Sequence, residues 1–119
     1  MKKNPPLESE IQSDILKELR KKGLFCWRNN SGFIPVKGKN GHTRRVVVGK
    51  TGLPDILGFF KDGHAFAIEV KRDESSPLRP SQIVSQQQLY TTKVYCIVAW
   101  SVQQVMDEFM VIIDPDQFI

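Results

Sequence analysis

The chain has 119 residues and a net charge of +4, with 40% hydrophobic and 25% charged residues. This length fits one domain over residues 1–119 with a single core, and the composition excludes the disordered and fibrous classes of protein. Every apolar run falls short of the ~20 residues that a membrane-spanning helix needs, and the N-terminal MKKNPP does not resemble a signal peptide. We therefore expect a cytosolic protein without a membrane partner.

Hydrophobic periodicity predicts the elements in chain order. Apolar residues at helical spacing predict a first helix over residues 7–22, with Gly23 as its C-cap. The following patterns predict a strand over 24–29, segments at 33–36 and 45–48, paired strands at 53–60 and 65–70, a helix over 80–90, a strand over 94–100 and a helix over 102–110. The polar centre at 37–43 is either a hairpin turn or a flexible basic loop. The order predicts an α/β fold with a mixed sheet.

Positive charge is concentrated in the first part of the chain. Residues 1–72 hold 15 Lys and Arg against 7 Asp and Glu, whereas residues 73–119 hold 2 against 6. Such a surface favours a nucleic acid, because each phosphate contact releases condensed counterions; a merely soluble basic surface is the alternative. The candidate phosphate contacts are Arg28, Lys37, Lys39, Arg44, Arg45 and Lys50.

The cysteines and tryptophans are interpreted as structural residues. Cys26 and Cys96 lie in apolar runs without a partner at metal-ligand spacing, which predicts buried thiols. Trp27 and Trp100 lie in predicted strands, which favours packing in the core over stacking on bases.

Two acids interrupt the central apolar strands. A carboxylate at Asp55 or Glu69 is costly to bury unless a cation neutralises it. Alternate side chains of a strand share a face, so Glu69 and Lys71 project the same way about 6.6 Å apart, with the Val70 carbonyl near the same edge. If the Asp55 strand pairs alongside, two carboxylates and one carbonyl converge. This all-oxygen set suits Mg²⁺ or Mn²⁺.

Phosphodiester hydrolysis is the chemistry that this set predicts. It requires a cation that binds the phosphate oxygens and activates water. Lys71 either stabilises the negative charge that develops on the phosphate or orients the attacking water. The alternative is structural: Glu69 forms a salt bridge with Lys71 or Arg72, and Asp55 forms one with Lys50. The turn residues His42 and His64 lack ligand spacing and are expected to be exposed to solvent.

The residues GLPD at 52–55 and IEVKR at 68–72 resemble the signature of the VRR-NUC family of PD-(D/E)XK nucleases. The similarity extends to residues 8–12 of the first helix and to LRPSQ at 78–82. It implies a restriction-endonuclease-like mixed sheet flanked by helices, and a Mg²⁺- or Mn²⁺-dependent DNA nuclease of a bacterial or phage-infected cytosol. Stand-alone members resemble Holliday-junction resolvases that act as homodimers. The basic segment 37–50 is longer than the usual connection of the family.

The resemblance also implies a glutamate from the first helix at the metal centre. Glu8 precedes Ile11 by three residues and so shares the buried face, with Gln12 one turn away, which favours Glu8 over Glu10. The alternative is that Glu8 only stabilises the helix N-terminus. Gln82 resembles the family's glutamine next to the active site, where it could bond a ligand or a phosphate; otherwise it is an exposed helix residue.

Three functions share this core. A structure-selective endonuclease is favoured, because 119 residues leave little room for the base-reading domain of a sequence-specific restriction enzyme. A DNA-binding module that does not cleave is the other alternative, and the complete set of Asp55, Glu69 and Lys71 argues against it.

Overall fold

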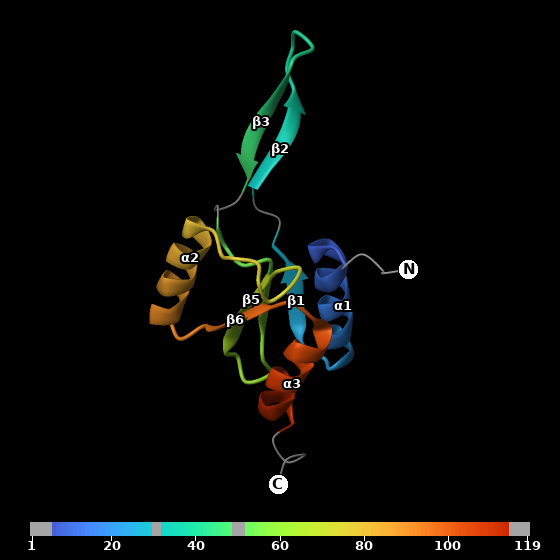
Figure 1. Ribbon diagram of the computed structural model, residues 1–119, viewed down its shortest axis with the longest axis vertical. Coiled ribbons are helices and arrows are strands. Elements are labelled where there is room, and N and C mark those ends of the chain that lie inside the picture. The colour runs from blue at the N-terminus through green and yellow to red at the C-terminus, as the bar shows by residue number, and fades with distance from the viewer. Residues whose placement is uncertain (1–5, 30–31, 49–51, 115–119) are drawn as a thin grey trace.

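The computed structural model describes residues 6–29, 32–48 and 52–114 (Figure 1). The elements in chain order are α1 (Glu8–Lys21), β1 (Phe25–Arg28), β2 (Gly32–Lys37), β3 (Thr43–Val48), β4 (Ile56–Phe59), β5 (Ala65–Val70), α2 (Pro80–Thr91), β6 (Tyr95–Ala99) and α3 (Val102–Ile113). Each predicted helix and strand is present, with ends that differ by a few residues.

A four-stranded sheet with the order β1-β4-β5-β6 forms the centre of the molecule. The first two pairs are antiparallel, and β5 and β6 are parallel. The parallel pair is connected by α2, as a βαβ crossover requires. The predicted α/β fold with a mixed sheet flanked by helices is therefore confirmed.

The first helix packs its apolar stripe on one face of this sheet. Its buried residues recur at helical spacing: Ile11, Ile15, Leu16 and Leu19. The Glu10 carboxylate accepts a hydrogen bond from the Leu7 N–H at 3.2 Å and so satisfies an amide at the helix N-terminus. Gly23 follows the helix with a φ of +82°, a conformation that side chains disfavour, and the chain turns there into β1.

The hydrophobic core lies between this face of the sheet and the helices α1 and α3. Every second residue of β5 contributes to it, namely Phe66, Ile68 and Val70. Phe109 of α3 lies with its ring centroid 5.1 Å from that of Phe66, and the Phe60 centroid is 4.9 Å from that of Phe66. The odd-numbered residues of β5 therefore face the other side of the sheet.

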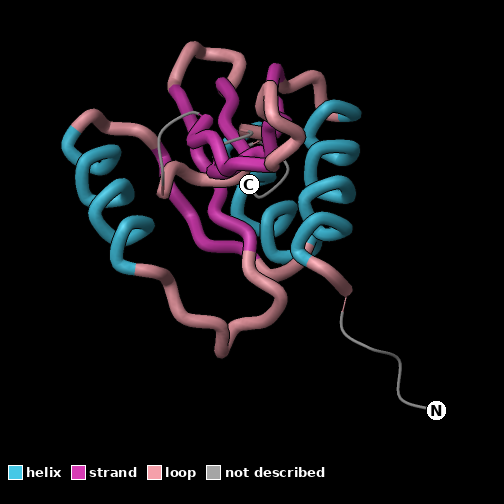
Figure 2. The backbone as a smooth tube through the Cα atoms, turned by 90° about the horizontal axis from the view of Figure 1, so that it is seen from above, coloured by secondary structure: helices cyan, strands magenta, loops and turns pink. Residues whose placement is uncertain are grey.

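The second helix covers that other side next to β6. Figures 1 and 2 show α2 and α1 on opposite sides of the strands. Its buried residues are polar, Gln82 and Ser85, whereas Ile83, Val84 and Tyr90 are exposed. The helix contributes no described residue to the hydrophobic core. Gln82 is instead aimed at the polar groups at the end of β5.

Strands β2 and β3 form a separate hairpin, which decides between the two interpretations of residues 37–43. The turn closes with a hydrogen bond from the Gly38 N–H to the His42 carbonyl at 2.8 Å, and Gly41 has a φ of +81°. Figure 1 shows the hairpin extending away from the main sheet, with its tip as the most distant part of the chain.

The prediction that both tryptophans pack in the core is wrong. Trp27 and Trp100 are each 37% exposed. β1 is an edge strand in which Cys26 faces the core, so Trp27 projects from the opposite face and contacts Phe25 and Phe59. Trp100 follows the last residue of β6 and lies beyond the sheet.

The predicted exposure of the cysteines and histidines agrees with the structure at three of the four positions. The Cys26 thiol is buried as predicted, whereas Cys96 is only half-buried. His42 and His64 are both exposed as predicted.

None of the helices in the described part of the chain is long and apolar enough to cross a membrane.

Candidate active site

The pairing of β4 with β5 brings the two predicted acids together. Ile56 pairs with Ile68 in this antiparallel ladder, and one further step of the register places Asp55 opposite Glu69. Residues that face each other across an antiparallel pair project from the same side of the sheet. The two carboxyl groups share a hydrogen bond. They lie on the side covered by α2, away from the hydrophobic core.

Asp55 is held by backbone groups on both neighbouring strands. Its Oδ2 accepts a hydrogen bond from the Val70 N–H at 2.7 Å. Its carbonyl accepts one from the Asn29 N–H at 2.7 Å, and the Asn29 side chain donates to the Pro54 carbonyl at 3.3 Å. β4 begins at Ile56, so Asp55 lies immediately before the strand and not within it.

Glu69 lies within β5 and is only 2% exposed. Its pKa is raised from 4.5 to about 8, first by burial and then by the negative charge of Asp55 and the hydrogen bond between them. The positive charges of Lys71 and Arg79 oppose this shift. Burial and the neighbouring charge of Asp55 therefore disfavour the ionised form of Glu69 at neutral pH.

Gln82 connects the carboxyl pair to Lys71. Its Nε2 donates to Glu69 Oε1 at 2.7 Å, and its Oε1 accepts a hydrogen bond from Lys71 Nζ at 2.9 Å. Lys71 is 6% exposed and Gln82 3%, so the expectation of an exposed glutamine is excluded. Among the described residues, Lys71 is bonded to the amide and forms no ion pair with Glu69, so this form of the alternative salt bridge is absent.

The first turn of α2 determines the orientation of the Gln82 side chain. Its Oε1 also accepts the Arg79 N–H at 2.8 Å, the bond by which a residue at the third helical position satisfies the N-cap amide. Gly52 allows the Asp55 segment to approach this turn, because a Cβ at that position would lie 2.5 Å from the Ser81 carbonyl oxygen. The glycine of the GLPD motif therefore has a packing role.

The structure does not gather Glu8 with the two acids. Among the described residues, no three His, Cys, Asp or Glu side chains lie close enough to hold one ion. Glu8 is half-buried at the first position of α1, on the face of Ile11 that packs toward the hydrophobic core, whereas Asp55 and Glu69 project from the other side of the sheet. A water-bridged role for Glu8, with Gln12 beside it, stays a prediction.

The donor set that is present fits a hard divalent cation. Asp55 and Glu69 supply two carboxylates, and the Val70 carbonyl at the end of β5 is a possible third oxygen ligand. Mg²⁺ characteristically binds through one or two carboxylates and keeps several waters. Two carboxylates held close together repel each other and therefore favour either a shared proton or a shared cation. The raised pKa of Glu69 results from burial and from this repulsion, as expected of a pair of carboxylates that can hold a cation.

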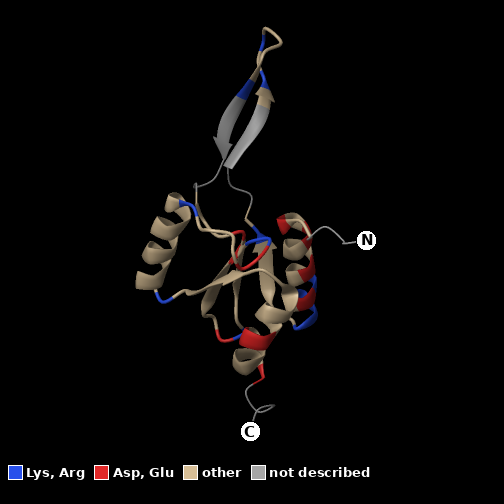
Figure 3. Cartoon of the chain, viewed as in Figure 1, with Lys and Arg blue, Asp and Glu red and all other residues tan. Residues whose placement is uncertain are grey.

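The predicted DNA-binding residues fall in two places. Lys37, Lys39 and Arg44 are exposed near the tip of the β2–β3 hairpin, where Figure 3 shows a group of basic residues. Arg28 lies at the end of β1 and is bonded to α1. Arg45 lies within β3, and Lys50 lies outside the described residues.

Two residues near the site were missed from the sequence. Asn29 holds the Pro54–Asp55 backbone, and Arg79 supplies an N-cap amide and a positive charge that acts on Glu69. The Arg-Pro pair at the predicted helix start was a signal for Arg79. No local signal exists for Asn29, because its partners are about 25 residues away in sequence.

Comparison with known proteins identifies the architecture. No protein-family model matches the sequence, and no curated protein matches it significantly. A solved structure described as "VRR_NUC domain" superposes with a TM-score of 0.61 over 87% of this chain and 92% of that one, at 20% identity. The chain has the VRR_NUC nuclease fold. The predicted restriction-endonuclease-like class is thus confirmed, and the VRR_NUC fold provides the frame in which the carboxyl pair lies.

Proposed function

We propose that this protein is a metal-dependent DNA endonuclease of the VRR-NUC family. The observation that carries the proposal is the cluster of Asp55, Glu69 and Lys71, joined by Gln82 at the end of β5. The two neighbouring carboxyl groups can hold a cation that activates water, and the ammonium group linked to them through one amide can stabilise the developing negative charge. The VRR_NUC fold and the GLPD and IEVKR motifs support the same function.

The residues proposed to hold Mg²⁺ or Mn²⁺ are Asp55, Glu69 and the Val70 carbonyl. When bound, the ion supplies a positive charge at the phosphate oxygens and lowers the pKa of the attacking water. Glu69 must lose its proton to become a ligand, so binding of the ion and release of this proton are coupled.

Lys71 is proposed to stabilise the negative charge that develops on the scissile phosphate. Its ammonium group is nearly buried, where a charge acts more strongly than in water. Gln82 is proposed as a positioning residue, because one amide fixes both Glu69 and Lys71 and is itself fixed by the Arg79 N–H. The residues of the site are thus prearranged before substrate arrives.

The favoured substrate is branched DNA, including Holliday junctions, cut by a homodimer. Two symmetric cuts need two active centres related by a two-fold axis. The extended β2–β3 hairpin supports this preference: its exposed residues Lys37, Lys39 and Arg44 can contact a second arm of a branched molecule, far from the carboxyl pair.

Cleavage of a panel of branched and linear DNAs tests the proposal. Wild type should cut in Mg²⁺ or Mn²⁺ and stop cutting when EDTA removes the metal. Lys71→Ala should still bind DNA but lose cutting by at least about 100-fold, the usual cost of removing a group that stabilises developing charge. Lys61→Ala, in the exposed β4–β5 turn, is the matched control and should cut normally.

The outcomes separate the competing functions. Binding without cutting by wild type in either metal would favour the non-cleaving DNA-binding module. Cutting of linear duplex at one short sequence would favour a restriction-type enzyme. Unchanged cutting by Lys71→Ala would remove Lys71 from the mechanism.

A further inference from the structure

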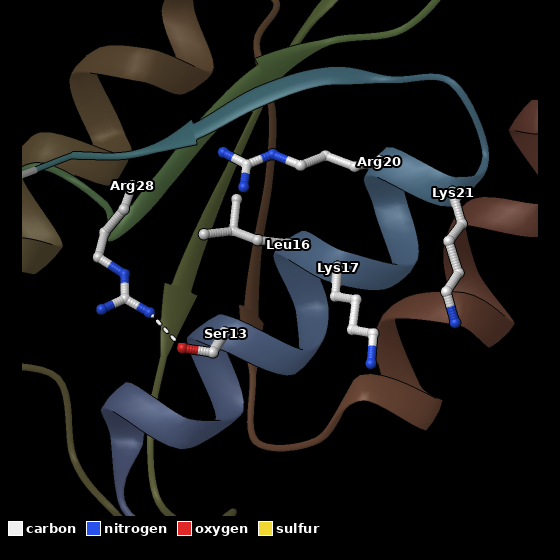
Figure 4. Close-up of a pocket in the computed structure, with 6 residues that line it drawn as sticks. All are labelled: Ser13, Leu16, Lys17, Arg20, Lys21 and Arg28. Carbon is white, nitrogen blue, oxygen red and sulfur yellow. Dashed lines mark hydrogen bonds between the residues drawn. The ribbon is translucent and has the colours of Figure 1, made fainter.

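A basic groove runs between α1 and the edge strand β1. It has a volume of about 720 Å³. Figure 4 shows its lining side chains, which are Ser13, Leu16, Lys17, Arg20, Lys21 and Arg28. Four of these six residues are cationic. We call this surface the α1–β1 groove.

Both arginines of the groove are held in place by neutral acceptors. Arg20 donates to the Cys26 carbonyl at 3.1 Å, and Arg28 donates to the Ser13 hydroxyl at 2.7 Å. Figure 4 shows the two guanidinium groups on either side of Leu16. Within the described residues, neither arginine forms an ion pair. Each therefore keeps its full charge and further N–H donors for an anion.

The two lysines extend the positive surface along α1. Lys17 and Lys21 leave successive turns of the helix and point in a similar direction (Figure 4). Lys21 is paired with Glu18 at 3.2 Å, whereas Lys17 has no ion pair with any residue that the structure describes. Like charges one turn apart repel each other. The helix dipole accounts for Arg20 and Lys21 in the last turn of α1, but not for Lys17 or for a cation on β1.

The groove begins at the end of the sheet that carries the candidate active site. Arg28 directly precedes Asn29, which is bonded to the carbonyls of Pro54 and Asp55. From there the groove follows β1 away from the carboxyl pair. The α1 segment from Ser13 to Lys21 is about 12 Å long at ~1.5 Å per residue. This is the axial length of about three to four nucleotides of one duplex strand.

We propose that the α1–β1 groove binds the phosphate backbone of the DNA segment that flanks the cut site. The proposal rests on the proposed nuclease function for the position of the scissile phosphate. The ligand is the sugar–phosphate backbone of a duplex arm, contacted by Lys17, Lys21 and the two held arginines. The contact carries no sequence information and fixes the position of the arm relative to the carboxyl pair.

Salt-dependent DNA binding tests the groove without cleavage. Fluorescence anisotropy would be measured in EDTA at several salt concentrations for wild type, for the double variant Lys17→Gln and Lys21→Gln, and for Lys93→Gln as a control. Lys93 is an exposed lysine in the turn before β6. The steepness of the fall of log affinity with log salt should be smaller by about 1.8 for the double variant than for wild type, since each lost duplex contact contributes about 0.9. If the two proteins bind equally at 1 M salt, the variant should therefore bind about 30-fold more weakly than wild type near 0.15 M salt. The control should match wild type.

Shortening the flanking duplex provides the second readout. Removal of about four base pairs from the arm in the groove should weaken binding by wild type more than binding by the double variant, which keeps only the arginine contacts, since that length matches the groove. Equal slopes for wild type and the double variant would overturn the proposal. Binding of inorganic phosphate at millimolar concentration to wild type but not to the double variant, with equal DNA slopes for the two proteins, would define a small-anion site. That result would also overturn the proposal.

The two proposals fail in distinguishable ways. Normal Mg²⁺-dependent cutting with an unchanged salt slope would reject the groove and keep the nuclease. Loss of slope in the double variant, with no cutting by wild type in any metal, would keep the groove as a DNA surface and reject the nuclease.

Discussion

Replacement of Glu69 by glutamine should change how the stability of the metal-free protein depends on pH. Glu69 has a pKa of about 8 in the folded chain, against 4.5 for an ordinary glutamate, because it is buried beside Asp55. Between these values the folded state holds a proton that the unfolded state has lost. The contribution of Glu69 to stability is therefore fully present below pH 4.5 and is lost as the pH rises through about 8.

The size of the effect follows from the shift. One unit of pKa difference corresponds to about 1.4 kcal/mol, so wild type should lose roughly 1 kcal/mol of stability for each pH unit between pH 5 and 8. The total, on the order of 3 kcal/mol, is a large part of the stability of a small domain. Glu69→Gln keeps the shape and a polar partner for Gln82 but cannot ionise, so this slope should disappear.

Urea unfolding in EDTA at several pH values measures this difference directly. Wild type should be destabilised relative to Glu69→Gln at pH 8, and the gap should close toward pH 5. Added Mg²⁺ should stabilise wild type increasingly as the pH rises, because the ion competes with the proton, and should have little effect on the variant. Parallel pH profiles for the two proteins would show that the pKa of Glu69 is not raised in the folded chain.

Two further substitutions test the site and the core on the other face of the sheet. Gln82→Ala should lower cleavage by about 10–100-fold and stability by about 1–3 kcal/mol, because Glu69 and Lys71 each lose a buried hydrogen-bond partner. Activity assays and thermal unfolding measure the two effects, and the exposed control Gln87→Ala should behave as wild type. Gly58→Ala should cost about 1–3 kcal/mol in urea unfolding, because its Cβ would lie 2.5 Å from Phe66 Cζ and 2.7 Å from Cys26 Cβ; wild-type stability would refute the close packing.

The secondary structure followed from local patterns where those patterns were strong. β5 was predicted at its observed ends, Ala65–Val70, because a turn with Gly63 precedes it and charged residues follow it. β4 starts later than its apolar run suggested. Pro54 has no N–H for a ladder and Asn29 binds the backbone before the strand, so regular pairing begins only at Ile56.

The exposure of Trp27 could not be predicted from the sequence of β1 alone. Alternation shows that Trp27 and Cys26 face opposite sides, but it does not tell which side the helices cover. That depends on where β1 lies in the sheet and on the position of α2, which covers β6 and leaves β1 free. The error is therefore one of topology, since the strand itself was predicted correctly.

The carboxyl pair was foreseeable because it depends on one hairpin. The turn between β4 and β5 sets the register, and the register alone places Asp55 opposite Glu69. The role of Gln82 depends on three separate features: the cap of α2, the crossover that brings α2 over the sheet, and the absence of a side chain at Gly52. The spacing of residues along the sequence does not show that these three features come together at one place.

This dependence makes Gln82 a link between folding and the proposed chemistry. Its amide oxygen serves the N-cap amide of α2 and the ammonium group of Lys71 at the same time. A substitution that retains the cap but not the amide nitrogen, Gln82→Glu, would keep the bond to Arg79 while placing a third carboxylate beside Glu69. The N-cap bond of α2 would then be kept while the site gains a negative charge beside Glu69, so a loss of stability and cleavage in this variant would come from the charge and not from the cap.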